Sequence, residues 1–338
     1  MTAETLAAGD ERWDALVDAA PTPDVYFRSG YGRAYEAAGE GRLVGVHAGS
    51  ALFPLLLREL PYGEEGSDAV TPYGYGGLLP LSAGSDAVAD VGQLRDWCAT
   101  NGVVSALLRL HPLLGGFEHL SEADGVEVRR HGPTTAIDLA RVEDGRLAGM
   151  SKGRKADLSV ARRELEVSWD RSDEGLERFR AVYDETMRRI GAAGHYLFPA
   201  GYYRTLAEGL GESLGVALAQ RGDELVGGSL FLADRAGRFA HYHLSGTTDA
   251  GRELKAGTLL VHEGAVWAAT RGCELLHLGG GTAGADSLYA FKRSFGGEEH
   301  EYSFATVVAE PERYDALVAR RAEEPEPLRP DFFPAYRA

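Results

Sequence analysis

A cluster of basic side chains stands out in this acidic chain and is a first candidate for chemistry. The protein has 338 residues and a formal net charge of −16 at pH 7, from 35 basic and 51 acidic residues. One segment nevertheless concentrates cations: Lys152, Arg154, Lys155, Arg162 and Arg163. Helical spacing brings positions 155, 159, 162 and 163 near one face, which favours binding of a phosphorylated ligand. A solvated helix face that balances Asp157 and Glu164 is the alternative, and the sequence leaves both interpretations open.

Two tyrosines alternate with glycines in the segment Thr71-Pro-Tyr-Gly-Tyr-Gly-Gly77. Glycine lets a backbone approach a ligand closely, so Tyr73 and Tyr75 are predicted to contact an acceptor substrate. The alternative is a tight turn that packs its own aromatic side chains.

A histidine pair, His241 and His243, alternates along a predicted strand, so both side chains point to one face. Such a pair can bind a metal ion, but the nearby sequence offers no third ligand, and we expect no metal site. His243 is instead predicted to contact the substrate, as is Ser245 where the same strand ends.

Several classes of protein are disfavoured. The sequence has no Ser-His-Asp order, nucleophile elbow, phosphate-binding Walker loop or dinucleotide fingerprint, and we expect no cofactor. The acidic balance disfavours a DNA-coating protein. Two cysteines, no apolar run of the ~20 residues that span a bilayer, and an acidic N-terminal segment without a signal-peptide pattern lead us to expect a cytoplasmic protein without a membrane span.

An internal sequence repeat, called the echo below, indicates which elements position these residues. Trp97-Cys-Ala-Thr-Asn-Gly102 and Trp267-Ala-Ala-Thr-Arg-Gly272 match at an offset of 170 residues, and an apolar run follows each. Each half also contains a predicted hairpin upstream, over residues 43–57 and 216–232. The echo predicts a tandem duplication of an α/β domain with a mixed central sheet flanked by helices. We place the domains at 1–145 and 146–338.

The second half has the more informative segments. Helices are predicted over residues 151–164, 174–190, 199–210 and 256–271, and strands over 239–244, 273–278 and 302–308. A polar loop, Asp249–Gly257, precedes the helix over 256–271. The free N–H groups at the start of that helix favour an anionic donor.

The chain resembles the FemAB-like (FemX-type) branch of the GNAT acetyltransferase superfamily over nearly its whole length. The motifs that carry the resemblance are Thr71–Gly77, Thr186-Met-Arg-Arg189, Tyr242-His-Leu-Ser-Gly-Thr247, Leu278-Gly-Gly-Gly281 and, as the most specific, Ser287-Leu-Tyr-Ala-Phe-Lys-Arg-Ser-Phe295. The resemblance implies tandem GNAT-like domains, with the acceptor on the first and the acyl donor and catalysis on the second. It also implies transfer of an amino acid from aminoacyl-tRNA to an amine.

The resemblance also implies roles for single residues. Lys292 would lie beside the scissile ester and stabilise the oxyanion, with Phe291 lining the acyl pocket. Arg189 would contact the acceptor, often through phosphates. Tyr202 and Tyr203 follow on the next predicted helix, and of these two we predict that Tyr202 faces the cleft. The tRNA acceptor end would meet Lys152, Arg154, Lys155 and Arg162. Without the resemblance, Lys292 and Arg189 read as solvated cations near helix ends.

Two departures bear on the substrates. The loop Asp249–Gly257 lacks the glycine-rich pattern with which acetyl-coenzyme A enzymes of this superfamily wrap a pyrophosphate. The segment Phe27-Arg-Ser-Gly-Tyr-Gly-Arg33 lacks the Gln-Ser pair and the lysine that cell-wall members use for substrate phosphates. A small-molecule amine is therefore an acceptor candidate beside a peptidoglycan precursor peptide. Two alternatives remain: an acyl-coenzyme A-dependent N-acyltransferase, and a GNAT-fold protein that only binds a ligand.

Overall fold

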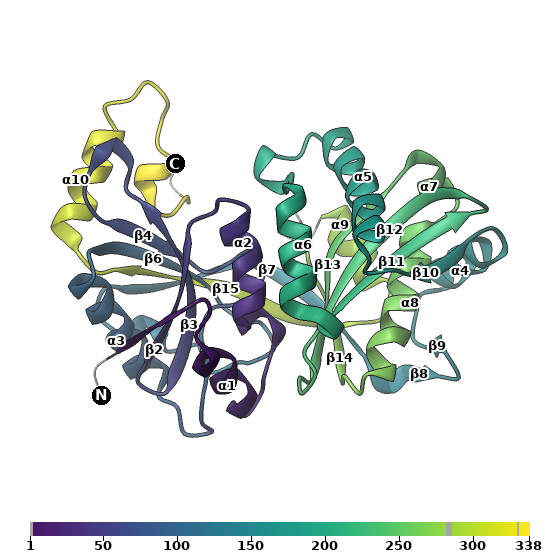
Figure 1. Ribbon diagram of the computed structural model, residues 1–338, viewed down its shortest axis with the longest axis horizontal. Helices are drawn as coiled ribbons and strands as arrows, with labels where there is room; N and C mark the ends of the chain where they lie inside the picture. The colour runs from purple at the N-terminus through teal and green to yellow at the C-terminus, as the bar shows by residue number, and fades with distance from the viewer. Residues whose placement is uncertain (1–2, 282–285, 330) are drawn as a thin grey trace. The chain divides into compact units, whose positions relative to one another are not determined.

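The chain forms two units in the computed structural model, which describes residues 3–281, 286–329 and 331–338. Unit 1 comprises Met1–His131 and Tyr302–Ala338, and unit 2 comprises Gly132–Glu301. In Figure 1 unit 1 contains the purple-to-blue and yellow segments, and unit 2 the teal and green segments. Within the described residues no helix combines the length and apolar character that a bilayer crossing requires.

Unit 1 is a mixed sheet with helices packed on it. The strand order is β1-β2-β3-β4-β6-β15, β5 is added beside β3, and β4 runs parallel to β6. The elements are β1 (Glu4–Ala7), α1 (Glu11–Ala19), α2 (Ser29–Ala37), β2 (Arg42–Ala48), β3 (Ala51–Glu59), β4 (Ser67–Val70), β5 (Leu79–Pro80), α3 (Ala87–Thr100), β6 (Val103–Arg109), the later part of β15 (Glu298–Val308) and α10 (Pro311–Arg321).

Unit 2 repeats this plan. Its strand order is β10-β11-β12-β13-β14-β7, and β13 runs parallel to β14. The elements are the later part of β7 (Val126–Asp138), β8 (Val142–Glu143), β9 (Arg146–Leu147), α4 (Lys152–Glu164), β10 (Glu166–Trp169), α5 (Asp173–Arg189), α6 (Ala200–Leu210), β11 (Leu214–Arg221), β12 (Glu224–Ala233), β13 (Phe239–Thr247), α7 (Asp249–Glu253), α8 (Ala256–Thr270), β14 (Leu275–Gly280) and α9 (Ser287–Arg293).

The duplicated fold predicted from the echo is confirmed. Trp97 lies near the end of α3 and Trp267 near the end of α8, and a strand in parallel pairing follows each helix. Gly102 and Gly272 follow these helices with positive φ of 68° and 79°, a conformation that glycine adopts without strain. Both predicted hairpins are present as β2–β3 and β11–β12.

The unit boundaries differ from the halves 1–145 and 146–338. Residues 134–138 of β7 pair with β14 in unit 2, although β7 follows β6 in the sequence. Residues 304–308 of β15 pair with β6 in unit 1, and α10 packs there with the segment around Tyr336. The last strand of each unit therefore comes from beyond the expected junction. A repeat in the sequence does not reveal that β7 and β15 each pair in the other half's sheet, because strand pairing depends on residues far away in the chain.

Helices cover both faces of the sheet in unit 2 (Figure 1). Adjacent residues of β12 show this: a Cβ on Gly227 would meet Ala256 and Leu260 of α8, and a Cβ on Gly228 would meet Phe179 of α5. The main core lies between the sheet, α4 and α8 and includes Phe231, Leu260 and Trp267. The helices predicted over 151–164, 174–190 and 199–210 correspond to α4, α5 and α6.

Candidate functional site

The parallel strands β13 and β14 pair only near their beginnings. The described ladder joins Phe239 to Leu275, Ala240 to Leu276 and His241 to His277, whereas β13 continues to Thr247 and β14 to Gly280. On its other edge β13 has a bulge, because Leu244 pairs with Leu230 and Tyr242 with Phe231, which leaves His243 as the extra residue. A bulge bends the strand that contains it. The described pairing of the two strands therefore stops before Gly280, whose carbonyl oxygen lies at the end of β14 next to Lys292.

Lys292 lies at the end of β14 and is buried. Asp286 caps α9 by accepting a hydrogen bond from the Tyr289 backbone, which fixes the helix. Lys292 is 9% exposed, and its Nζ donates to the carbonyl oxygen of Gly280 at 2.7 Å. Burial lowers the pKa of Lys292 to about 8, and the Asp286 carboxylate partly opposes that shift. At neutral pH the side chain is therefore a mostly protonated cation in a poorly solvated place.

The neighbours of Lys292 on α9 point elsewhere, as the helical spacing predicts. Arg293 is exposed, and its guanidinium reaches only toward the carbonyl oxygen of Gly297 at 3.5 Å. Phe291 is half-buried and packs edge-on against Phe295, with ring centroids 5.2 Å apart. Its ring also lies beside the start of α8, because a Cβ on Gly257 would be 3.8 Å from it. The inward orientation agrees with the proposed role of Lys292, which stays a prediction.

Arg154 packs against Phe291 and the start of α8 and does not lie on an open basic surface of α4. Its guanidinium lies 5.1 Å from the centre of the Phe291 ring and donates to the Thr258 hydroxyl of α8 at 3.0 Å. It also forms an ion pair with Asp157 at 2.9 Å. Arg154 therefore adds a positive charge close to the start of α8.

The rest of the basic cluster divides into two groups. Lys152, Lys155 and Arg163 are exposed on α4. Arg162 is paired with Glu263 at 3.5 Å and lies 3.3 Å from the buried His262 ring. Lys152 and Lys155 thus remain accessible to a phosphorylated ligand, whereas Arg162 already has partners in α8. The predicted contact with tRNA stays a prediction for all of them.

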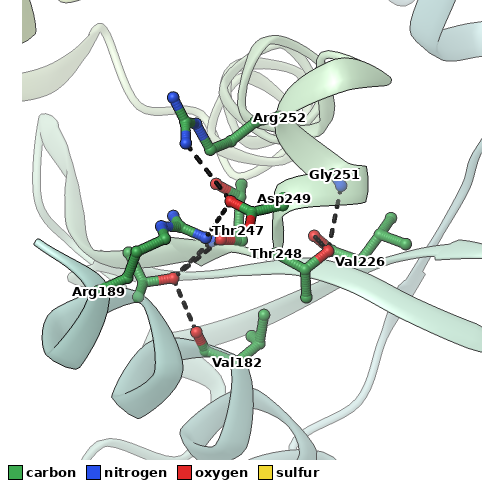
Figure 2. Close-up of polar contacts among 9 residues, drawn as sticks. Val182, Arg189, Val226, Thr247, Thr248, Asp249, Gly251 and Arg252 are labelled. Carbon is green, nitrogen blue, oxygen red and sulfur yellow. Dashed lines mark hydrogen bonds and ion pairs between the residues drawn. The ribbon is translucent and has the colours of Figure 1, made fainter.

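The connection between β13 and α8 contains a short helix, α7, where the sequence predicted a polar loop. Thr248 caps α7 by accepting a hydrogen bond from the Gly251 backbone at 3.1 Å (Figure 2). Gly251 packs so closely on β12 that a Cβ there would lie 2.0 Å from the carbonyl oxygen of Val226. A pyrophosphate-binding loop would direct such a backbone amide at its ligand. Here the Gly251 amide donates its hydrogen bond to the Thr248 hydroxyl instead.

Arg189 ends α5 and meets this connection. It donates to the Asp249 carboxylate at 3.2 Å, and Arg252 lies 3.4 Å from the same oxygen (Figure 2). The Thr186 hydroxyl accepts from the Thr247 backbone at 2.9 Å, which joins α5 to the end of β13. A Cβ on Gly246 would come within 2.8 Å of the Tyr183 backbone, so this close approach requires glycine. Two of the resemblance motifs therefore meet in space.

Tyr202 and His243, predicted independently, are in contact. Tyr202 is fully buried on α6, and its hydroxyl lies 2.9 Å from His243 Nε2. Burial, with a smaller contribution from His241, lowers the pKa of His243 to about 3. The imidazole is therefore neutral at pH 7. A neutral ring can accept a hydrogen bond from the tyrosine hydroxyl.

Ser245 lies on the opposite face of β13. Its hydroxyl accepts from Ser229 at 2.9 Å and lies 3.3 Å from the carbonyl oxygen of Gly228. Hydrogen bonds from Ser229 and Ser245 also reach Tyr242, whose pKa burial raises. Ser245 thus joins a polar cluster on the face of β13 away from Tyr202, and its predicted substrate contact remains untested.

Tyr73 and Tyr75 lie in unit 1, where the glycine-rich segment packs on an aromatic side chain of its own unit. Gly74 has a φ of 105°, and a Cβ there would lie 2.5 Å from the Tyr26 ring. Tyr75 packs edge-on against Tyr26 and Tyr302 at 5.8 and 5.0 Å between centroids. Tyr73 is 40% exposed. The glycines thus have a packing role, and the acceptor contact of both tyrosines stays a prediction.

Residues that the sequence did not identify also contribute to the site. The carbonyl oxygen of Gly280 holds Lys292, and the Thr258 hydroxyl holds Arg154. Gly280 lies within the Leu278–Gly281 motif, but the motif did not indicate which carbonyl oxygen would hold Lys292. Thr258 gave no signal, because it lies inside an apolar helical pattern.

Comparisons with known proteins agree with this architecture. Residues 150–293 match the family model of the acetyltransferase (GNAT) domain. The crystal structure of FemX superposes with a TM-score of 0.68 at 14% identity, over 93% of this chain and 99% of FemX. The structure of L-PGS from Bacillus licheniformis gives 0.58 at 14% identity, over 89% and 92%. No curated protein matches the sequence.

A further neighbour bears on the duplication. A tandem GNAT protein from the clavulanic acid biosynthesis pathway superposes with a TM-score of 0.52 at 14% identity, covering 91% of this chain and 98% of that one. The chain is therefore a tandem GNAT-fold protein with the FemX-type architecture. At these identities the likeness defines the fold.

Proposed function

We propose that the protein is an aminoacyltransferase that moves an amino acid from aminoacyl-tRNA to the amine of a small molecule or a peptide, forming an amide. The observation that carries this proposal is Lys292, a buried cation at the end of β14 and beside the separation of β13 from β14. The FemX-type fold and the GNAT acyltransferase match of residues 150–293 support it.

The proposed reaction has two steps. The neutral amine attacks the ester carbonyl carbon, so that a C–N bond forms and negative charge develops on the carbonyl oxygen. The Lys292 ammonium stabilises that oxyanion, a contribution worth about 3–4 kcal/mol where a fixed donor meets the developing charge. The intermediate then collapses, the C–O bond to the terminal ribose breaks, and the amine proton passes to the ribose oxygen.

The connection between β13 and α8 supports tRNA over coenzyme A as donor. α7 and the committed Gly251 amide leave no glycine-rich backbone for wrapping a pyrophosphate within the described residues of this connection. The exposed Lys152 and Lys155, with Arg154 beside Phe291, are the cations proposed to face the acceptor end. Such contacts weaken as salt rises.

The test is a transfer assay with a mixed pool of radiolabelled aminoacyl-tRNAs and a panel of amines. The proposal expects an amide product whose formation is abolished by ribonuclease treatment of the donor. Lys292→Met is expected to remove most of the turnover, and Arg293→Met, one position along the same helix, to retain it.

Two results would overturn the proposal. Transfer that survives ribonuclease but needs an acyl-coenzyme A would identify coenzyme A as the donor carrier. No transfer from either donor, with unchanged ligand binding by Lys292→Met, would identify a binding protein instead.

A further inference from the structure

A pocket lies in unit 2 at the end of α8 that is remote from Phe291. It has a volume of about 500 Å³ and is formed where β10 ends, β11 begins and α8 ends; Trp169, Arg171, Glu212, Gly215, Trp267 and Arg271 are among its lining residues. α8 is 15 residues long, so its end lies ~20 Å from its start beside Phe291. A volume of this size is typical of sites for small molecules.

The floor of this pocket is a pair of stacked indoles. The rings of Trp169 and Trp267 lie 5.5 Å apart between centroids and 12° from parallel. Trp267 is buried, whereas Trp169 is 39% exposed. A Cβ on Gly215 would come within 2.8 Å of Trp267 and 2.9 Å of Trp169, so glycine leaves the space that both rings occupy. Trp169 therefore contributes exposed aromatic surface to the pocket, and aromatic side chains stack with planar rings.

Two arginines and two carboxylates surround these rings, and Glu212 acts on both arginines, because it pairs with Arg171 and also attracts Arg271. Arg171 forms an ion pair with Glu212, and the Asp170 carboxylate accepts a hydrogen bond from the Ser172 backbone at 2.9 Å. The Arg271 guanidinium lies 4.1 Å from the centre of the Trp267 ring. No ion pair of Arg271 is found among the described residues. The pocket therefore presents a flat apolar surface beside an arginine that can accept an anion.

We infer that this pocket binds a nucleotide, whose base stacks on Trp169 and whose phosphate pairs with Arg271. Base stacking on an aromatic side chain combined with an arginine contact is how proteins hold single nucleotides without reading their sequence. The chemistry is shared by a free mononucleotide and by an unpaired nucleotide of an RNA. The inference does not depend on the transfer reaction, because none of the residues proposed for catalysis lines the pocket.

The experiment is a binding titration of the full chain, first with AMP and separately with deacylated tRNA. Trp169→Ala should weaken binding by roughly tenfold to a hundredfold, the usual cost of losing one stacked base, and Trp169→Phe should restore most of it. Arg271→Gln should weaken AMP more than adenosine. Glu212→Gln should tighten AMP binding, because it removes a carboxylate that pairs with Arg171 and attracts the Arg271 guanidinium, and this exposed side chain can be changed without disturbing the core.

Matched controls come from unit 1, where the Arg329 guanidinium lies 4.2 Å from the centre of the exposed Phe332 ring. Phe332→Ala and Arg329→Gln should leave both titrations unchanged. AMP binding that Trp169→Ala weakens assigns the site to a free nucleotide, and an effect on tRNA alone assigns it to RNA. Binding of both ligands unaffected by Trp169→Ala and Arg271→Gln overturns the inference. The AMP titration involves neither an aminoacyl donor nor Lys292, so its result is separable from a failure of the transfer proposal.

Discussion

The two units share one strand order but differ where their parallel strands end. In unit 1 the pairing of β4 with β6 continues past the last ladder pair, because the Thr71 backbone donates to Leu107 at 3.0 Å. The Thr71 hydroxyl then accepts from the Arg109 backbone at 3.0 Å. In unit 2 the described ladder stops at His241 and His277, and β13 continues to Thr247 apart from it.

The distribution of lysine follows the same division. Lysine occurs only at positions 152, 155, 255 and 292 among 35 basic residues, and all four belong to unit 2. Only Lys292 among them is buried. Burying an ammonium group costs folding free energy unless hydrogen bonds or an opposite charge compensate for the lost water. The comparison indicates that the duplication supplied two similar scaffolds, of which one has parallel strands whose pairing stops early and a buried cation beside the end of one of them.

The largest expected effect is on turnover. Lys292→Met should lower kcat by about 10²–10³-fold with little change in KM, because the ammonium meets charge that exists mainly in the transition state. Arg109→Met, at the end of the corresponding strand of unit 1, should lower kcat less than about tenfold. Steady-state kinetics of both variants check this. An equal decrease of kcat in the two variants would show that the units do not differ in function in this way.

The next effect is the pH dependence of kcat. In the proposed reaction the cationic form of Lys292 is the active one, and burial lowers its pKa to about 8, so kcat should fall as pH rises above that value. Raising the pH also deprotonates the acceptor amine. The assay therefore uses a saturating concentration of acceptor, so that the fall of kcat at alkaline pH reports Lys292. Lys292→Arg should be slow, since a guanidinium places its donors differently, but its alkaline limb should move to higher pH. An alkaline limb unchanged in Lys292→Arg would assign it to another group.

Local patterns made much of the fold predictable. The hairpins and the Trp-containing helix ends follow from turn residues and helical spacing close in the chain, whereas the inward position of Lys292 on α9 was implied only by the family resemblance. The exchange of β7 and β15, the bulge at His243 and the contact of Arg154 with Thr258 were not predictable. Each depends on a partner far away in sequence, such as the 104 residues between Arg154 and Thr258. α7 was missed because five residues give too short a pattern.

A smaller effect separates stability from function at two threonines. Thr186→Val leaves the Thr247 backbone N–H without its 2.9 Å acceptor, and Thr71→Val does the same to Arg109. Each should cost about 1–3 kcal/mol of unfolding free energy. Only Thr186→Val should also raise KM for the donor, since it loosens α5 against the end of β13. Denaturant titrations and kinetics on both variants test this, and a raised KM in Thr71→Val would contradict it.

The smallest effect concerns the carboxylate between Arg189 and Arg252. Asp249 is 76% exposed, so its ion pairs contribute little, and Asp249→Asn should change the free energy of unfolding by less than about 1 kcal/mol. It should nevertheless lower KM for the phosphate-bearing substrate about twofold to threefold at low salt, because the two guanidinium groups lose a competing anion. Glu64→Gln in unit 1 breaks a comparably exposed pair with Arg320, 3.3 Å apart, and should leave KM unchanged. The Asp249→Asn gain should disappear in the Arg189→Gln background. A gain that persists there would show that Arg189 does not contact the substrate.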